Sequence, residues 1–223
     1  MFVKHTALAA AALLVSTGAC AQVGVTADLG STGAGFHLVV PIGSQLNGRF
    51  GVNAFNHDFD KSSNGIDYDV KGKLKTVDAL FDWYLRAGGS FHLTGGLVYN
   101  GNHFDALAKA NPLGKFTLNG DTYNALDVGV LTGRVDYRKA APYLGIGWGN
   151  ALAPDHRWNF NADLGAFYQG SPKVQLASVG CATSQAVCKA VAADVAALGQ
   201  SFGNDINNFK VYPVLRASVS YRF

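Results

Sequence analysis

Apolar and polar residues alternate along the C-terminal segment 209–223, which reads FKVYPVLRASVSYRF. Its odd positions are mostly apolar, and its even positions hold most of the charged and hydroxyl side chains. Because a β-strand sends successive side chains to opposite faces, this pattern predicts a strand with one apolar and one polar face. The segment is long enough to cross a bilayer, which takes roughly 9–11 residues, with the apolar face toward lipid and the polar face toward a lumen.

Seven earlier segments show the same alternation, so the sequence predicts about eight strands in one all-β domain. They are 23–29, 36–42, 49–54, 66–86, 91–100, 141–150 and 158–169. The connections after the second, fourth and sixth strands are short, and those after the third, fifth and seventh are longer, although the first connection is also short. Short periplasmic turns and long extracellular loops are typical of outer-membrane barrels.

Residues 1–21 have the pattern of a secretory signal peptide, with a basic start, a short apolar run and Ala19-Cys20-Ala21 as a small-x-small cleavage site. We therefore expect cleavage before Gln22 and a mature barrel domain over 22–223. Lipoprotein processing at Cys20 is an alternative, although Thr17 stands where such sites usually carry Leu. An exported chain would keep Cys181 and Cys188, which we expect to form a disulfide in an oxidising periplasm.

Composition excludes several other classes of protein. Hydrophobic residues make up 48% of the chain, and no run of 18 or more apolar residues follows the signal, which argues against a helical membrane protein. The 27 glycines suit tight turns and a crowded barrel interior. The net charge of +3 includes no basic block, so we expect no nucleic-acid partner.

Two motifs point to a known family. The ending Val219-x-Tyr221-x-Phe223 resembles the C-terminal signal that the assembly machinery of Gram-negative outer membranes reads, and PYLGIGWG over 142–149 resembles a glycine-rich barrel strand. The chain as a whole resembles the small eight-stranded outer-membrane proteins of the OmpA/OmpW kind. This resemblance implies a transmembrane antiparallel up-and-down β-barrel of about eight strands in the cell outer membrane. It also implies outer-membrane lipids, lipopolysaccharide and the barrel-assembly machinery as partners, and leaves the oligomeric state open.

Charged residues at the inward positions of the predicted strands are the candidate site. They are Asp28, Arg49, Asp78, Asp82, Arg86, Asp163, Arg216 and Arg222. A barrel of about eight strands is just wide enough for side chains to fill it, and an unpaired charge in a narrow lumen is costly. We therefore predict a network of ion pairs that plugs the lumen. A gated narrow pore, in which some pairs exchange partners, is the alternative, and catalysis by the carboxylates is a more distant one.

Enzymes that modify lipid A occur on this fold and use Ser and His near the outer rim. His57 and His103 are placed toward that rim, but the chain has no His-x-Ser pair and no spacing that builds a triad. The sequence therefore predicts a protein that is not an enzyme and needs no cofactor.

The acidic stretch around Asn64-Gly65 predicts the tip of a hairpin. The spacing Asp60-x-Ser62-x-Asn64 resembles the start of a calcium loop, but Lys71 stands where such a loop requires Glu. We therefore predict a solvated acidic hairpin and no metal site.

Segment 184–198 is the one helix that the sequence predicts. Val187, Val191, Val195 and Leu198 form a single apolar stripe at helical spacing. We expect this helix to pack over the barrel mouth or on its own loop; a membrane-surface or partner-binding helix is the alternative, although a basic face is lacking.

The predicted function is a structural or surface role with a mostly plugged polar lumen. The alternatives are a narrow conduit for small or hydrophobic solutes and, more distantly, a lipid-modifying enzyme.

Overall fold

The computed structural model describes residues 22–63, 66–118 and 120–223 of the chain. The predicted signal peptide, its cleavage site and Cys20 lie outside the described residues, and so does the predicted Asn64-Gly65 hairpin tip. Among the described helices, none is long and apolar enough to cross a membrane.

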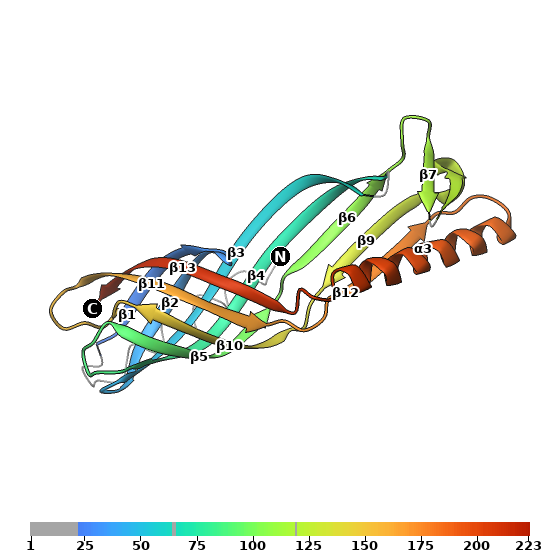
Figure 1. Cartoon of the computed structure of the whole chain (residues 1–223). Helices are drawn as coiled ribbons and strands as arrows, with labels where there is room; N and C mark the ends of the chain where they lie inside the picture. The colour runs from blue at the N-terminus through green and yellow to red at the C-terminus, as the bar shows by residue number, and fades with distance from the viewer. Residues whose placement is uncertain (1–21, 64–65, 119) are drawn as a thin grey trace, which may run out of the picture.

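Within the described residues, eight antiparallel strands close into a ring in the order β4-β3-β2-β1-β13-β11-β10-β5, and β5 pairs back with β4 (Figure 1). These strands are β1 (Gly24–Gly30), β2 (Gly33–Gly43), β3 (Leu46–Ser63), β4 (Ile66–Tyr84), β5 (Phe91–Asn100), β10 (Ala140–Trp148), β11 (Trp158–Tyr168) and β13 (Val211–Arg222). The all-β antiparallel fold is therefore confirmed, and each of the eight predicted segments corresponds to a strand of the ring, which is part of a sheet of eleven strands among the described residues. We call the end of the barrel with Gly24 and Arg222 the terminal end, and the opposite end the distal end.

The predicted alternation decides which side chains fill the lumen. On β13, Val214, Arg216 and Ser220 are buried, whereas Leu215 and Ala217 are exposed on the outside. The last strand also closes the barrel, because it pairs with β1 on one side and β11 on the other. The alternation of this strand therefore decides which of its side chains line the lumen, and its pairing on both edges closes the ring.

Strands β3 and β4 extend well beyond the rest of the ring. The sequence analysis ended the third strand at 54, but β3 continues to Ser63 and pairs with β4 residue by residue up to Ile66. Strand β4 ends at Tyr84, two residues before the predicted end. The distal half of this hairpin therefore stands clear of the barrel (Figure 1).

Three further strands widen this distal part, which we call the distal sheet. They are β6 (His103–Lys109), β9 (Val130–Asp136) and β12 (Lys173–Val179), and they continue from β4 in the order β4-β6-β9-β12. They come from the connection between β5 and β10 and from the connection between β11 and β13. The sequence analysis treated these strands as parts of long loops.

Two helices and a hairpin cover one face of the distal sheet. They are β7 (Lys115–Leu118) with β8 (Asp121–Asn124), α2 (Ala125–Val128) and α3 (Gln185–Asp205). Ser184 caps α3 by accepting a hydrogen bond from the Val187 amide. Val191 and Val195 are buried in an apolar cluster with residues of β7, α2 and β9. The predicted apolar stripe is therefore confirmed, and the helix packs on its own loop, although it continues to Asp205.

A hydrogen bond also joins the hairpin to this helix. The Tyr123 hydroxyl donates to the Asp194 carboxylate, and this bond raises the pKa of Tyr123 to about 12. The distal part thus has its own apolar core and its own polar contacts, separate from those of the lumen.

The predicted disulfide between Cys181 and Cys188 is present, with 5.9 Å between the two Cα atoms. It joins the segment before α3 to the first turn of that helix. Because the bond closes a short loop outside the ring, its effect is expected to be local.

Reduction of this disulfide is expected to leave the unfolding midpoint of the barrel unchanged and to speed proteolysis between residues 179 and 202. Chain entropy assigns a short closed loop about 2–3 kcal/mol, which acts on the start of α3 and not on strand pairing. Limited proteolysis with mass spectrometry measures the change in cleavage, and urea unfolding followed by heat-modified gel mobility measures the midpoint. The double variant Cys181→Ser/Cys188→Ser without reductant is the control. Cleavage at equal rates in oxidised and reduced protein would contradict the prediction.

Candidate functional site

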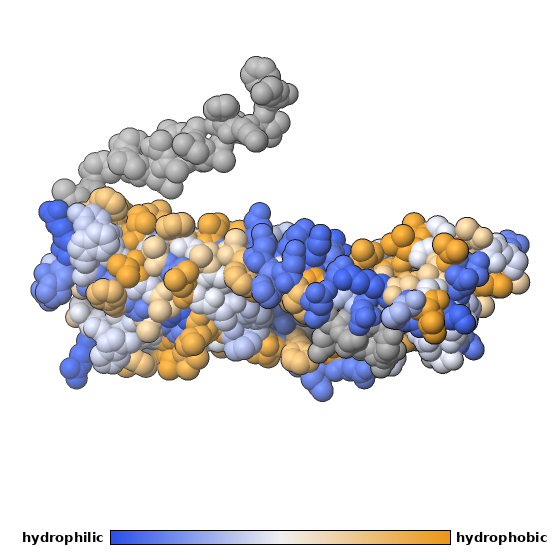
Figure 2. Space-filling view, turned by 90° about the horizontal axis from the view of Figure 1, so that it is seen from above, coloured by the Kyte–Doolittle hydropathy of each residue, from blue (hydrophilic) through white to orange (hydrophobic). Residues whose placement is uncertain are grey.

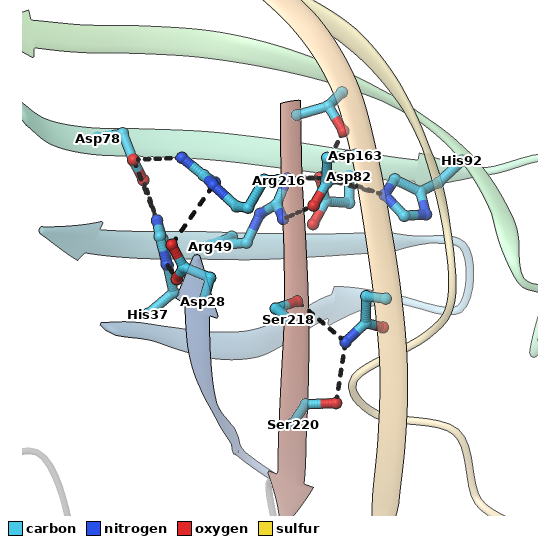
Figure 3. A network of polar contacts seen from close by, with 12 residues as sticks. Asp28, His37, Arg49, Asp78, Asp82, His92, Asp163, Arg216, Ser218 and Ser220 are labelled. Carbon is cyan, nitrogen blue, oxygen red and sulfur yellow. Dashed lines mark hydrogen bonds and ion pairs between the residues drawn. The ribbon is translucent and has the colours of Figure 1, made fainter. Parts of the chain in front are cut away.

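Inward side chains from several strands meet in the lumen and form two ion-pair clusters (Figure 3). In the first, His37 of β2 lies between two carboxylates. Its Nδ1 is 2.6 Å from Asp28 Oδ1, and its Nε2 is 2.9 Å from Asp78 Oδ1. Arg216 of β13 faces the same two carboxylates, at 3.3 Å from Asp78 and 3.6 Å from Asp28. We call these four residues the His37 cluster.

The second cluster is centred on Arg49 of β3. Its guanidinium reaches across the lumen to Asp163 of β11 through two hydrogen bonds of 2.9 and 3.0 Å, and to Asp82 of β4 at 3.1 Å. His92 Nε2 lies 3.5 Å from Asp163, and the Thr94 hydroxyl donates to Asp82 at 2.7 Å. A bidentate arginine–carboxylate pair is a strong and directional contact. We call Arg49, Asp82, His92 and Asp163 the Arg49 cluster.

The two clusters have the same composition: two aspartates, one arginine and one histidine each. With neutral histidines each cluster would carry a formal charge of −1, and with charged histidines it would be neutral. Both ring nitrogens of His37 face carboxylate oxygens. Only the imidazolium form donates from both nitrogens, so this geometry fits a charged His37 and a balanced cluster.

Two glycines make room for the histidine rings. A Cβ atom on Gly51 would lie 2.2 Å from Cδ2 of His37, and a Cβ atom on Gly147 would lie 2.2 Å from Nε2 of His92. Real Cβ atoms do not approach other atoms so closely, so both rings occupy space that only glycine leaves open.

An apolar cluster in the lumen is built from side chains of β4, β5, β10, β11 and β13. Its buried members are Leu80, Val98, Ala141, Tyr143, Phe167 and Val214. The Phe167 ring stacks on Tyr212, with 4.8 Å between centroids. Along β11 and β13, Phe167 and Val214 lie further toward the distal end than Asp163 and Arg216. The Arg49 cluster therefore has apolar side chains on its distal side.

Six of the eight predicted network residues meet in the lumen, and two do not. Arg86 is exposed in the turn after β4, because the strand ends at Tyr84. Arg222 lies at the terminal end, where its guanidinium donates to the Pro154 carbonyl oxygen at 2.8 Å. Neither residue joins the two clusters, because Arg86 lies past the end of β4 and Arg222 bonds to a carbonyl oxygen at the terminal end.

His37 and His92 are members of the network that the sequence analysis left out. Both occupy inward positions and are about 2% exposed. A histidine at an inward position that faces glycine on a neighbouring strand is the signal that could have identified them. Gly51 pairs with His37, and Gly147 pairs with His92.

The three residues of the predicted assembly signal occupy outward positions near the terminal end of β13. The Tyr221 ring packs edge-on against Trp158 at 4.9 Å and against Phe223 at 5.0 Å. Val219 pairs with Phe160 of β11 and Ala27 of β1. These residues are accessible on the outside of the ring, and their recognition by an assembly machinery remains a prediction.

The acidic hairpin is engaged in ion pairs. Lys109 of β6 contacts both Asp60 and Asp69, and the hydrogen bond from Lys109 lowers the pKa of Asp69. In the part of the chain that the structure describes, no group of three or more acidic, His or Cys side chains has the geometry to hold a metal ion. His103 faces Asp105 at 3.7 Å.

The outside of the ring is apolar. Its exposed large side chains include Phe36, Phe50, Phe81, Leu144, Trp148, Phe160, Leu164 and Leu215. Figure 2 shows hydrophobic residues gathered over the barrel part and a hydrophilic band toward the middle of the molecule. An apolar exterior around a polar interior is the reverse of a soluble fold. The ring, its exterior and its lumen define a membrane-spanning antiparallel β-barrel.

Two solved structures with a TM-score above 0.5 support this fold. CarO2 and CarO of Acinetobacter baumannii each match with a TM-score of 0.56 and 21% identity; the matches cover 92% and 93% of this chain and 100% of each of those chains. A major outer membrane protein from Thermus thermophilus matches with a TM-score of 0.45 and 18% identity, over 92% of this chain and 100% of that one. No family model and no curated protein matches the chain.

Proposed function

We propose that this protein is an outer-membrane barrel with a structural or surface role and a lumen that does not conduct solutes. The observation that carries this proposal is the packing of the lumen. The side chains of the Arg49 cluster bond across the barrel, and the apolar cluster covers them on the distal side. An eight-stranded ring is narrow enough for such side chains to fill it completely.

The outer membrane is the location that this architecture fits. A closed barrel satisfies the hydrogen bonds of every strand in lipid, and the resemblance of the C-terminal signal supports assembly by the outer-membrane machinery. With the terminal end in the periplasm, the distal sheet and α3 project into the medium (Figure 1). Outer-membrane lipids and lipopolysaccharide are then the partners of the apolar exterior. The distal part is the surface that is exposed outside the cell.

Planar-bilayer conductance together with liposome swelling tests this proposal. We expect no discrete current steps and no swelling in small sugars or amino acids. An open porin reconstituted in the same lipid is the positive control, and protease digestion of the distal loops confirms insertion. Discrete steps from the purified barrel would overturn the proposal and support the alternative of a narrow conduit. Lipid A mass spectrometry after expression tests the more distant alternative of a lipid-modifying enzyme.

A further inference from the structure

A cavity of about 220 Å³ lies at the distal mouth of the barrel, where the ring meets the distal sheet. Its lining is mainly aromatic and aliphatic. The lining includes Leu74, Phe209, Val211 and Tyr212, together with the polar residues Asn102 and Gln169. Strands β4, β6 and β13 contribute to it, together with the segments that follow β5, β9 and β11. Tyr212, which stacks on Phe167 of the apolar cluster, joins the cavity to the packed lumen below.

The cavity is open to the outside because the strands on one side of the barrel extend less far in the distal direction than those on the other side. Strands β1 and β2 are joined by a tight turn, and the Ser31 hydroxyl in this turn donates to the Pro213 carbonyl at 2.9 Å. The β3–β4 hairpin continues much further in the distal direction. Phe209 and Val211, which line the cavity, are 63% and 55% exposed.

One residue of this lining carries a buried side-chain nitrogen without a partner. Asn102 is 1% exposed; its Oδ1 accepts a hydrogen bond from the Lys75 amide at 2.8 Å, which fixes the orientation of the side-chain amide. Its Nδ2 has no hydrogen-bond partner among the described residues. The neighbouring amide of Gln169, in contrast, uses both of its atoms, with Asn100 and with the Phe209 carbonyl.

A buried donor without an acceptor is unfavourable, and apolar walls disfavour a charged ligand. We propose that this cavity binds a small, mainly aromatic or aliphatic molecule with one acceptor oxygen, which receives the hydrogen bond from Asn102 Nδ2. Binding at this site does not require passage through the barrel, because the cavity is reached from the distal side. The site is thus independent of whether the lumen conducts.

Two probes of nearly the same shape test the polar contact. In 2-acetylnaphthalene a carbonyl oxygen is available as an acceptor, and in 2-isopropenylnaphthalene a CH₂ group replaces that oxygen. Ligand-observed NMR with the protein in lipid nanodiscs, corrected by empty nanodiscs, measures the protein-dependent binding of each. We expect the wild-type protein to bind the ketone about threefold to tenfold more tightly than the hydrocarbon, which corresponds to one net hydrogen bond.

Three variants distinguish binding of the probes in the cavity from their uptake into the bilayer. Asn102→Asp keeps an acceptor for the Lys75 amide and removes the free donor, so the preference for the ketone should disappear. Leu74→Trp fills the cavity and should abolish the binding of both probes. Leu107→Trp adds the same indole on the opposite face of the distal sheet, where Leu107 is 44% exposed, and should leave binding unchanged.

Equal binding by wild-type protein and Leu74→Trp would overturn the site, because both probes would then be in lipid only. Equal binding of the two probes by the wild-type protein would overturn the role of Asn102. Both of these comparisons remain decisive if Asn102→Asp fails to fold, and thermal unfolding of each variant identifies such a failure.

Discussion

Replacement of Arg49 by alanine is expected to lower the free energy of unfolding by about 3–5 kcal/mol. The guanidinium makes three hydrogen bonds to Asp82 and Asp163, and these aspartates are 3% and 2% exposed. Its removal leaves two buried carboxylates, and His92 is then the one basic side chain that remains in their cluster. Urea unfolding in detergent or lipid, followed by tryptophan fluorescence, measures the change.

Arg86→Ala is the matched control for this experiment. The same side chain is removed, but Arg86 is exposed in the turn after β4, where substitutions usually change stability by less than about 0.5 kcal/mol. If the two variants unfolded at the same urea concentration, the Arg49 cluster would not be a significant source of stability.

The second large effect is expected from a single added methyl group. Gly51→Ala should destabilise the barrel by about 1–3 kcal/mol, because its Cβ would lie 2.2 Å from the His37 ring and overpack the lumen. Displacement of that ring would also deprive Asp28 and Asp78 of a shared hydrogen-bond donor. Chemical unfolding gives the stability change, and histidine NMR signals report the displacement.

Gly43→Ala is the control for this change, since a Cβ at Gly43 would meet no atom within 4 Å. The variant is expected to unfold at the same denaturant concentration as the wild-type protein or at a slightly higher one, because alanine restricts the conformations of the unfolded chain. An unchanged midpoint for Gly51→Ala, together with unchanged histidine signals, would show that the lumen near His37 is looser than the structure indicates.

The sequence could predict the strands of the ring because the pattern that identifies each strand lies within one short segment. A period of two in eight segments identifies the strands and assigns each side chain to the lumen or to the outside. It does not identify partners, because contacts across a barrel depend on the heights at which tilted strands place their side chains. Arg49 and Asp163 face each other across the lumen from strands that are not neighbours in the ring. Parity alone could place both inside without pairing them.

The distal sheet was missed for a different reason. The face of β6 and β9 toward α3 carries small residues such as Ala106, Ala108 and Gly133, so apolar periodicity is weak there. The opposite face carries charges that pair between strands, as Arg134 does with Asp105. These strands form because the long β3–β4 hairpin leaves an edge of β4 free for pairing. The segments that meet at this edge are distant from one another in the sequence. The cavity at the barrel mouth could not be predicted either, because it depends on the same junction.

The pairing of β1 with β13 bears on the order in which this protein can be made. The ring has no open edge only when the last strand is in place, and β13 ends at Arg222. Until then, β1 and β11 each present unpaired backbone groups, which are costly in the hydrocarbon layer. The ring therefore cannot close before β13 has been synthesised and has reached the membrane. A truncation within β13 leaves two open edges instead of a smaller barrel.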